Sequence, residues 1–413
     1  MTTPHVDVIA GRARTLPASA TASLDATIKD LAASGRDVIN LTSGEVDFPT
    51  LKQASAAGMD AIAAGLTRYT AAAGTAELRR AVSDWLAARH GTSYRPEQVI
   101  VTGGAKQALF HAIMAILDGG DEVLLPAPYW VSFPQMIRLA GGVPVVVAGS
   151  PENGFKITPD AMLDHATGRT KVLVLNNPVN PTGAVYSRAE LEAIAEVAER
   201  LNLIVISDEI YAEIVYPPAT FSSFASLSDG AMRRAVTVNG VSKTFAMTGW
   251  RIGYAAAPPP LIRAMTAIQS HTASGPSSIS QQAALGALTS PDAIGELERR
   301  REDLDRRRRL IIQGLSSVPG VKLPFEPEGA FFLMADVTAC FGTRFLGTAI
   351  GDSASFAQAL LDRELVGVVP GESFGADGYV RVSYVAQEAR LRDAIGRLRR
   401  FTGALEPQLS HSG

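Results

Sequence analysis

A lysine and an arginine in the segment 241–254 are the side chains best suited to chemistry in this chain. Lys243 follows a short apolar run at 235–238, and Arg251 comes shortly after it. A lysine amine can form an imine with an aldehyde, and a guanidinium nearby can hold a phosphate. Those are the two anchors that pyridoxal phosphate needs. Because lysines that follow strands are usually solvated, the pair needs support from other motifs.

A glycine pair, Gly103 and Gly104, separates a predicted strand from a predicted helix in the segment 102–109. Glycine lets the backbone approach a ligand closely, and the free amides and dipole of a helix N-terminus suit a phosphate. The segment is not a P-loop, because no Gly-Lys-Ser/Thr follows, and it does not match Gly-x-Gly-x-x-Gly. Taken alone, it is a weak signal for phosphate binding.

Polar residues also follow two predicted strands. Asn180 lies in the proline-rich turn 176–183, which is either an ordinary loop or a rigid support that directs Asn180 at a ring oxygen. Asp208 ends the apolar run 203–206, and an acid buried there needs a cation, which a protonated pyridine nitrogen would supply. Tyr211 would share its face if a helical turn begins there.

Alternating strands and helices predict how these residues are positioned. Short β-branched runs and helical patterns follow one another through the middle of the chain, which predicts an α/β fold with a mostly parallel, helix-covered sheet. Ligands of such sheets bind beyond the carboxyl ends of the strands. The predicted strands are 99–101, 122–125, 143–147, 171–175, 203–207 and 236–238, and the predicted helices include 105–117 and 188–201.

The chain changes character after about residue 290, where a long charged helix precedes shorter apolar runs at 329–334, 366–369 and 379–384. This change predicts a second, smaller α/β domain. The predicted segments are 1–45, which includes an amphipathic helix near 23–33 and packs with the small domain, 46–290 for the large domain, 291–405 for the small domain and 406–413 for a polar tail.

Composition excludes several classes of function. Of 413 residues, 38 are Lys or Arg and 41 are Asp or Glu, so the net charge of −3 does not support nucleic-acid binding. The arginine-rich stretch 299–309 is interleaved with acids and apolar residues, which predicts a solvated amphipathic helix. The lone cysteine, Cys340, excludes a disulfide framework, and most of the histidines lack ligand spacing, so we expect no metal.

Targeting signals are also missing from the sequence. The N-terminal residues do not form a basic segment followed by an apolar one, and no apolar run approaches the roughly 18 residues of a membrane span. We therefore expect a cytoplasmic protein that does not bind membranes.

Six motifs in order make the chain resemble the class I/II aminotransferases of PLP fold type I. Three of them are Asn-Pro-x-Asn-Pro-Thr-Gly at 177–183, Ser-Asp-Glu-Ile-Tyr at 207–211 and Ser-Lys-x-Phe-x-Met-x-Gly-Trp-Arg-x-Gly at 242–253. The resemblance also covers 44–48, 128–130 and 380–384, and it extends from about residue 10 to 400. Within the family, the chain is most similar to the bacterial aspartate aminotransferases, some of which also accept prephenate.

The resemblance implies a catalytic role for several residues around the cofactor, pyridoxal 5'-phosphate. Lys243 would hold the cofactor as an imine and, once displaced by substrate, would shuttle a proton. Asp208 would keep the ring nitrogen protonated, which makes the ring an electron sink. Asn180 and Tyr211 would hydrogen-bond the phenolic oxygen of the ring, and Trp130 would stack on its face.

The phosphate group would have its own binding residues, again by resemblance. Arg251 and the backbone of Gly104, Ala105 and Lys106 would bind it. Tyr69 matches a tyrosine that reaches the phosphate of the neighbouring subunit. This match implies a homodimer whose active sites lie at the interface.

The resemblance also implies where the substrate binds. Arg381 would grip the α-carboxylate with a two-pronged geometry that lysine cannot reproduce, and Gly44 would add a backbone contact, beside Asn180 and Trp130. The Gly-x-Ser-x-Gly sequence around Phe374 is followed by a turn and a strand instead of the helix of a hydrolase. We therefore expect Phe374 to line the substrate pocket.

Residues at the other end of the pocket bear on side-chain specificity. By resemblance, Lys106 would help to read a distal carboxylate, and Ser19 and Thr21 would lie in a segment that closes over the same end. The alternatives are that Lys106 is a solvated helix residue and Ser19 a helix cap. Val46 replaces a proline usual in the family, and His271 lies where glutamine is common near the pocket. These departures leave open a specialised biosynthetic enzyme.

The function implied is transfer of an α-amino group between an L-amino acid and a 2-oxo acid, with aspartate, glutamate, prephenate or aromatic compounds as candidate substrates. A second hypothesis keeps the cofactor but changes the outcome to cyclisation, β-substitution or oxidation. A third is a non-catalytic, cofactor-sensing regulator. Without the resemblance, the residues alone favour a surface ion pair for Arg381, a core position for Trp130 and a dimer packing role for Tyr69.

Overall fold

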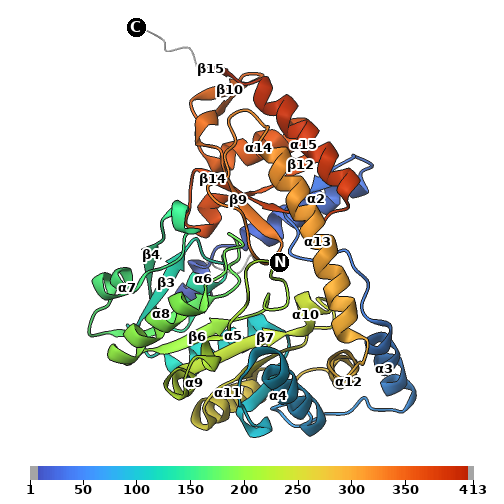
Figure 1. Ribbon diagram of the computed structural model, residues 1–413, viewed down its shortest axis with the longest axis vertical. Helices are drawn as coiled ribbons and strands as arrows, with labels where there is room; N and C mark the ends of the chain where they lie inside the picture. Colours follow the sequence, from blue (N-terminus) through green and yellow to red (C-terminus); the bar gives the residue numbers. More distant parts are fainter. Residues whose placement is uncertain (1–7, 408–413) are drawn as a thin grey trace.

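The computed structural model describes residues 8–407, in which a large α/β body carries a smaller unit at one end (Figure 1). The body is built on a seven-stranded sheet of order β2-β8-β7-β6-β5-β3-β4, in which β8 alone runs antiparallel to its neighbours. This confirms the predicted, mostly parallel sheet. Its strands are β2 (Val99–Thr102), β3 (Glu122–Ala127), β4 (Val143–Ala148), β5 (Thr170–Asn176), β6 (Ile204–Asp208), β7 (Ala235–Gly240) and β8 (Gly253–Ala256).

Side chains alternate along these strands between two apolar cores. In β5, Leu173 and Leu175 enter one core and Val172 and Val174 enter the other. Because both faces are covered, the strands are nearly continuous apolar runs. The helices of the first face include α4 (Ala76–His90), α8 (Arg188–Arg200) and α12 (Ser278–Leu288), and those of the second include α5 (Ala105–Ile116), α6 (Phe133–Leu139) and α11 (Pro259–Thr272).

Shorter helices complete the body. The helix α3 packs closely on α12, and α10 follows β7 directly. These remaining helices are α3 (Lys52–Ala63), α7 (Pro159–His165), α9 (Asp229–Arg234) and α10 (Val241–Thr244).

The smaller unit has its own core around the antiparallel sheet β13-β14-β9. The predicted run 366–369 is interrupted: its first residues pair with the N-terminal segment as β12, and its last residue begins β13. The elements of this unit are α13 (Ala293–Leu315), β9 (Phe332–Asp336), β10 (Thr343–Phe345), β11 (Thr348–Ile350), α14 (Ser353–Glu364), β12 (Val366–Gly367), β13 (Val369–Pro370), β14 (Tyr379–Ser383), α15 (Glu388–Gly403) and β15 (Glu406–Pro407).

The first two residues of the predicted polar tail form a strand that the sequence analysis did not predict. Glu406 and Pro407 form β15, which pairs with β10 and so closes a three-stranded sheet with β11. Two exposed residues can form a short strand when a neighbouring edge strand offers them backbone partners. The rest of that tail, 408–413, lies outside the described residues, as do residues 1–7.

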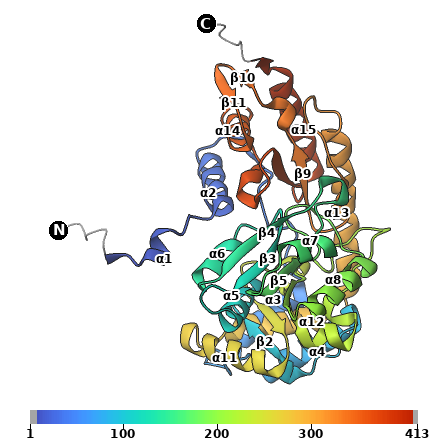
Figure 2. The same cartoon turned by 90° about the vertical axis from the view of Figure 1, so that its left-hand side faces the viewer.

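The N-terminal segment lies beside the smaller unit. Its strand β1 (Ile39–Asn40) pairs in parallel with β12, and Ile28 of α2 (Ala20–Ala33) packs against Gly367. The segment that carries α1 (Gly11–Arg14) extends away from the rest of the chain (Figure 2). The division of the chain at 45, 290 and 405 remains a prediction. Ala293 and Leu297 follow the predicted boundary at 290, yet they pack in a core of the large body, so α13 contributes to both units.

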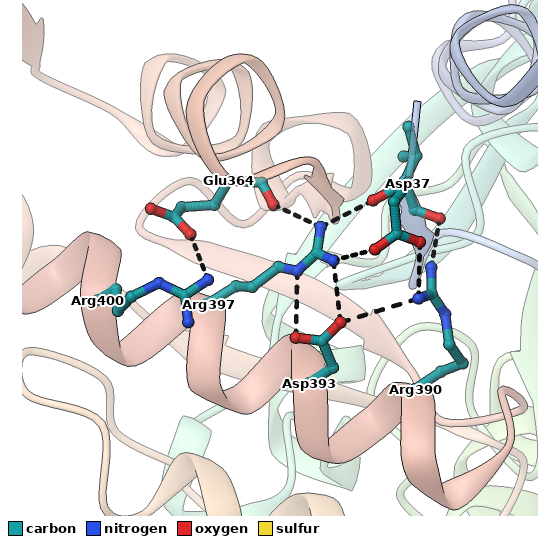
Figure 3. Close-up of polar contacts among 7 residues, drawn as sticks. Asp37, Glu364, Arg390, Asp393, Arg397 and Arg400 are labelled. Carbon is teal, nitrogen blue, oxygen red and sulfur yellow. Dashed lines mark hydrogen bonds and ion pairs between the residues drawn. The ribbon is translucent and has the colours of Figure 1, made fainter. Parts of the chain in front are cut away.

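An ionic cluster fastens this segment to α15, and we name it the Asp37 cluster (Figure 3). The carboxylate of Asp37 pairs with the guanidinium groups of Arg390, at 2.8 Å, and of Arg397. Arg397 also pairs with Asp393 at 2.9 Å and donates to the carbonyl of Glu364 at 3.1 Å. The chain just before β1 is therefore held to two helices of the smaller unit.

The arginine-rich helix is not simply solvated, which corrects the expectation from its sequence. Arg300 and Arg307 are only 7% and 6% exposed, and both guanidinium groups lie 5.4 Å from the centre of the Phe48 ring. Arg300 donates to the carbonyl of Pro49 at 2.7 Å, and Arg307 donates to Asp47 at 2.8 Å. These partners lie far away in the sequence, so helical periodicity alone could not reveal them.

Two further findings concern residues 8–407 as a whole. None of the helices in this range is long and apolar enough to cross a membrane. No group of three or more His, Cys, Asp or Glu side chains is arranged to hold a metal ion within the same range.

Replacing Gly253 tests how closely β8 must approach α5. A Cβ atom at Gly253 would collide with the backbone of Gly104 and Ala105, and backbone atoms cannot move aside cheaply. We expect Gly253→Ala to lower the free energy of unfolding by about 1–3 kcal/mol, the scale for overpacking. Gly119→Ala is the control, because nothing lies within 4 Å of the atom it adds. Equal denaturant midpoints for the two variants would contradict the close approach.

Candidate active site

A cavity of about 550 Å³ lies at the carboxyl edge of the central sheet. Strands β2, β3, β5, β6 and β7 all run in the same direction, so residues that follow them meet at this edge. The N-terminal segment and the smaller unit supply the remaining walls. The predicted site residues that line the cavity are Ser19, Thr21, Gly44, Ala105, Lys106, Trp130, Asn180, Asp208, Tyr211, Lys243, Arg251 and Arg381.

Asp208 is a buried acid at the end of β6. It is 5% exposed, and one carboxylate oxygen accepts a hydrogen bond from the amide of Ile210 at 3.3 Å. Burial raises the pKa of Asp208 to about 7, and the nearby charge of Glu209 adds to the rise, whereas the amide of Ile210 and the charge of Lys243 oppose it. A buried carboxyl group with a raised pKa becomes ionised when a cation binds beside it, and the two charges then attract each other strongly.

Lys243 lies in α10, directly after β7. Its Nζ atom donates to the carbonyl of Gly44 at 2.6 Å. Burial lowers the pKa of Lys243 to about 8, and the positive charges of Arg251 and Arg381 contribute, whereas Glu45 opposes them. The lysine therefore yields a neutral, nucleophilic amine more readily than a surface lysine does.

Tyr211 lies beside Asp208 in an irregular turn, without the helical turn on which its expected position depended. Its ring packs edge-on against Phe331 and Phe332, with centroids 5.4 and 5.9 Å away. Burial raises the pKa of Tyr211, and the charge of Arg381 opposes the rise. The hydroxyl group therefore stays protonated at neutral pH and can donate a hydrogen bond into the cavity.

The N-terminus of α5 and Arg251 form a positively charged corner. Gly104 occupies the capping position at φ 96° and has no side chain, which leaves the first amides of the helix without an acceptor. A Cβ atom at Gly104 would collide with the guanidinium of Arg251, which donates to the carbonyl of Gly103 at 3.2 Å. Glycine therefore permits an arginine and a helix N-terminus to meet at one point, which suits an anion.

Arg381 is a buried cation without an acid partner. It is 3% exposed and donates to the side chain of Asn180 at 3.0 Å and the carbonyl of Thr42 at 2.7 Å. Its Nε atom has no partner among the described residues. Burial lowers the pKa of Arg381 to about 10, and no carboxylate of residues 8–407 offsets this. The interpretation of Arg381 as a surface ion pair is therefore wrong, and its free donors suit a carboxylate.

Phe374 has a different place from the one expected. It is fully buried, does not line the cavity, and lies with its ring centre 5.0 Å from the guanidinium carbon of Arg381. Phe332, which sequence reasoning missed, lines the cavity and lies 4.3 Å from the same atom. Both rings support the guanidinium through cation–π contacts.

Lys106 and the start of α2 also line the cavity. Lys106 is exposed by surface area, yet its ammonium lies 4.8 Å from the centre of the Trp130 ring. Partial burial and the charge of Arg251 lower the pKa of Lys106. Ser19 occupies the N-cap position of α2 without a capping hydrogen bond, and its hydroxyl lies 3.1 Å from that of Thr21. The two hydroxyls are therefore hydrogen-bonded to each other, which leaves one O–H for a ligand that enters the cavity.

Three charged residues of the cavity were missed by the sequence analysis. Asp25 and Lys29 of α2 form an ion pair at 2.7 Å, and Glu45 lies on the neighbouring segment. Thr21, Asp25 and Lys29 are spaced four residues apart, so they share one face of α2. That polar stripe was a usable signal. Nothing in the sequence indicated that it faces a cavity.

Tyr69, Val46 and His271 lie outside the lining of this cavity. Tyr69 is 93% exposed on the surface of the chain, and His271 is also exposed. Val46 packs against the core of the smaller unit, in a turn that Asp47 holds through Arg307. The turn that lacks the usual proline is therefore held by an ion pair.

The fold and the site together define an enzyme of the aminotransferase type. A family model described as "Aminotransferase class I and II" matches residues 36–398. The chain belongs to this family, as the sequence motifs predicted. Its fold, PLP fold type I, is confirmed by the solved structures below, and members of this family use pyridoxal phosphate.

Several characterised relatives agree on the reaction. The chain is 46% identical to an aspartate/prephenate aminotransferase of Cereibacter sphaeroides, over 91% of this chain and 94% of that protein. It is 44% identical to a bifunctional aspartate and glutamate/aspartate-prephenate aminotransferase of Petunia hybrida, over 98% and 85%. The crystal structure of the Rhizobium meliloti aspartate aminotransferase is similar with a TM-score of 0.92 at 39% identity, covering 96% of this chain and 99% of that one.

The aspartate aminotransferase of Thermus thermophilus, solved with maleate, is similar with a TM-score of 0.90 at 41% identity, over 95% and 99% of the two chains. This enzyme is therefore an aminotransferase. The alternative outcomes of cyclisation, β-substitution or oxidation are not favoured by these matches.

Arg381 gives the site a direct test. Arg381→Ala should weaken binding of a non-reacting dicarboxylate such as maleate by about 2–5 kcal/mol, because one partner of a buried charge pair is lost. Arg381→Lys should recover only part of this, since an ammonium cannot match a carboxylate in two places. Inhibition constants measured for the parent and both variants check the prediction. An unchanged constant in Arg381→Ala would contradict it.

Proposed function

We propose that this enzyme uses pyridoxal 5'-phosphate on Lys243 to move an α-amino group between an L-amino acid and a 2-oxo acid, with dicarboxylic substrates preferred. One observation supports this most strongly. The same cavity holds a lysine with a lowered pKa, a buried acid and a buried arginine, and within residues 8–407 the acid has no fixed cation and the arginine has no acid. Each lacks the partner that a cofactor or an amino-acid substrate supplies.

The residues of the cavity fit the cofactor group by group. The corner of Arg251, Gly104 and Ala105 suits its phosphate, and Asp208 suits its ring nitrogen. Trp130 lines the cavity and offers a ring for stacking. When bound, the cofactor withdraws electrons from the substrate Cα and so makes its proton acidic.

The chain supplies the binding and the proton transfers. Arg381 binds the α-carboxylate, with Gly44 and Asn180 beside it, and this fixes the orientation of the Cα–H bond. Once it is released from the cofactor, Lys243 is neutral and would accept the proton of the substrate Cα. It would then deliver this proton to the former aldehyde carbon of the cofactor. Tyr211 donates a hydrogen bond to the ring oxygen from its protonated hydroxyl.

The preference for dicarboxylic substrates rests on the end of the cavity near α2. Lys106 provides a cation there, and the hydroxyl pair of Ser19 and Thr21 provides a donor. A distal carboxylate requires such partners when it is removed from water. An aspartate- or glutamate-type donor fits this pattern, and so does prephenate as an acceptor, which also carries a second carboxylate.

We also propose that the enzyme is a homodimer with shared sites. Tyr69 is 93% exposed, and three apolar residues on or just after α3 are exposed near it in sequence: Met59 at 64%, Ile62 at 57% and Leu66 at 49%. Such a surface favours association with another protein surface, and a self-complementary contact would produce a two-fold dimer. Tyr69 would then reach the cofactor phosphate of the partner. The cytoplasmic location stays a prediction.

The purified enzyme tests the reaction directly. Mixed with a panel of amino acids, it should lose its yellow absorption band with aspartate or glutamate and release the matching 2-oxo acid. Lys243→Ala should abolish turnover, because the amine that moves the proton is lost. Lys322→Ala, an exposed lysine on the smaller unit, is the control and should retain activity. Ammonia or peroxide in place of a 2-oxo acid would contradict the proposal.

Lys106 tests the substrate preference separately. Lys106→Met should lower kcat/KM for aspartate about tenfold or more, since a distal carboxylate loses a charged partner worth about 1.5–3 kcal/mol. The value for phenylalanine should change much less. Parallel kinetics on both substrates, with Lys322→Met as control, measure the selectivity. Equal losses for the two substrates would show that Lys106 does not read the distal carboxylate.

A further inference from the structure

Glu209 is a fully buried acid that the proposed function does not use. It follows Asp208 directly, yet only Asp208 lines the cavity, so the two carboxylates point to different surroundings. Glu209 has 0% of its surface exposed. A buried carboxylate is costly unless it is paired or well solvated by hydrogen-bond donors, so its presence here needs a physical reason.

The donors around Glu209 converge on one of its two oxygens. Its Oε1 atom accepts from the hydroxyls of Ser207 and Ser223, both at 2.9 Å, and from the amide of Phe224 at 3.1 Å. Its Oε2 atom has no partner among the described residues. A proton on Oε2 would have no acceptor, whereas three donors to Oε1 stabilise a negative charge. Burial raises the pKa of Glu209, and the hydrogen bonds from Ser223, Ser207 and the amide of Phe224 oppose the rise. The geometry of these donors therefore favours the ionised form against the effect of burial.

The charged and titratable groups around Glu209 leave that charge only partly balanced. His90, at the end of α4, opposes the rise in the pKa of Glu209, but its Nε2 atom already lies 3.0 Å from Glu213. Glu213 is also paired with Arg89. Besides Asp208, the other groups that face Glu209 are Tyr94 and Tyr254, whose pKa values burial raises, so both stay neutral.

We propose that Glu209 is a positioning residue for the cofactor site: its buried negative charge lies behind Asp208 and strengthens the field that keeps the cofactor's ring nitrogen protonated. This rests on the proposed role of Asp208. A single carboxylate beside the ring nitrogen must hold that proton against a positively charged cavity that includes Lys106, Arg251 and Arg381. A second negative charge, screened from water by full burial, acts over several ångströms in a protein interior.

The charge can be removed while the shape is kept. Glu209→Gln presents the same acceptor to Ser207, Ser223 and Phe224. In the holoenzyme, a nearby negative charge favours the protonated form of the cofactor linkage. The pH midpoint at which the visible band of the bound cofactor changes should therefore fall by roughly one unit in Glu209→Gln, the scale of one uncompensated charge in the interior.

Three further variants make the measurement decisive. Ser223→Ala removes a donor but keeps the charge, so its midpoint should stay near the parent value. Glu209→Leu removes the charge with an apolar side chain of similar size and must reproduce the shift, which also covers the case in which Glu209→Gln does not fold. Asp208→Asn should raise the midpoint instead, because the ring nitrogen then loses its proton and the linkage becomes more basic.

Each outcome decides the matter. A lower midpoint in the neutral Glu209 variants, with Ser223→Ala unchanged, supports the proposal. Parent-like midpoints in the neutral variants overturn it, and so does an equal shift in Ser223→Ala, which would mean that Glu209 only holds the loop at Phe224. If Asp208→Asn also leaves the midpoint unchanged, the role of Asp208 fails as well, and the proposed function loses that residue independently.

Discussion

The site depends on charges that are buried before their partners arrive. Asp208, Lys243 and Arg381 all lie out of water, and in each case burial is the largest cause of the altered pKa. Holding such groups ready costs stability in the chain alone. The same cost would become binding energy if a cationic ring nitrogen, an aldehyde and a carboxylate filled the cavity as proposed, because these groups would then meet Asp208, Lys243 and Arg381 in a medium that screens charges little.

The cavity keeps its shape despite this cost in stability, because contacts outside the cavity hold the segments that form its walls. The N-terminal segment carries Gly44 and Ser19, and it is held to α15 by the Asp37 cluster and to β12 by strand pairing. The long helix α13 then ties the next turn, around Phe48, to both cores through its buried arginines. Segments far apart in the sequence thus line one cavity.

Sequence reasoning succeeded where local pattern and chemistry agree. The strand ends at Asp208 and before Lys243 were predictable, because parallel strands deliver their carboxyl ends to one edge and the polar residues there stand out against apolar runs. Sequence reasoning failed where the position of a side chain depends on a partner far away in the sequence. The burial of Arg307 depends on Asp47, and the place of Phe374 depends on the guanidinium of Arg381.

Short strands were also difficult to predict from the sequence. Strand β8 covers only Gly253–Ala256, and four small or isolated apolar residues carry no period that distinguishes a strand from a loop. Its place in the sheet comes from tertiary contact: Gly253 lets β8 pass directly beneath the start of α5. That contact places Gly104 beside Arg251. Strand β8, which the sequence did not reveal, therefore helps to build the positively charged corner whose residues the motifs indicated. The motifs therefore indicate which side chains could react, and the packing of small residues brings those side chains together.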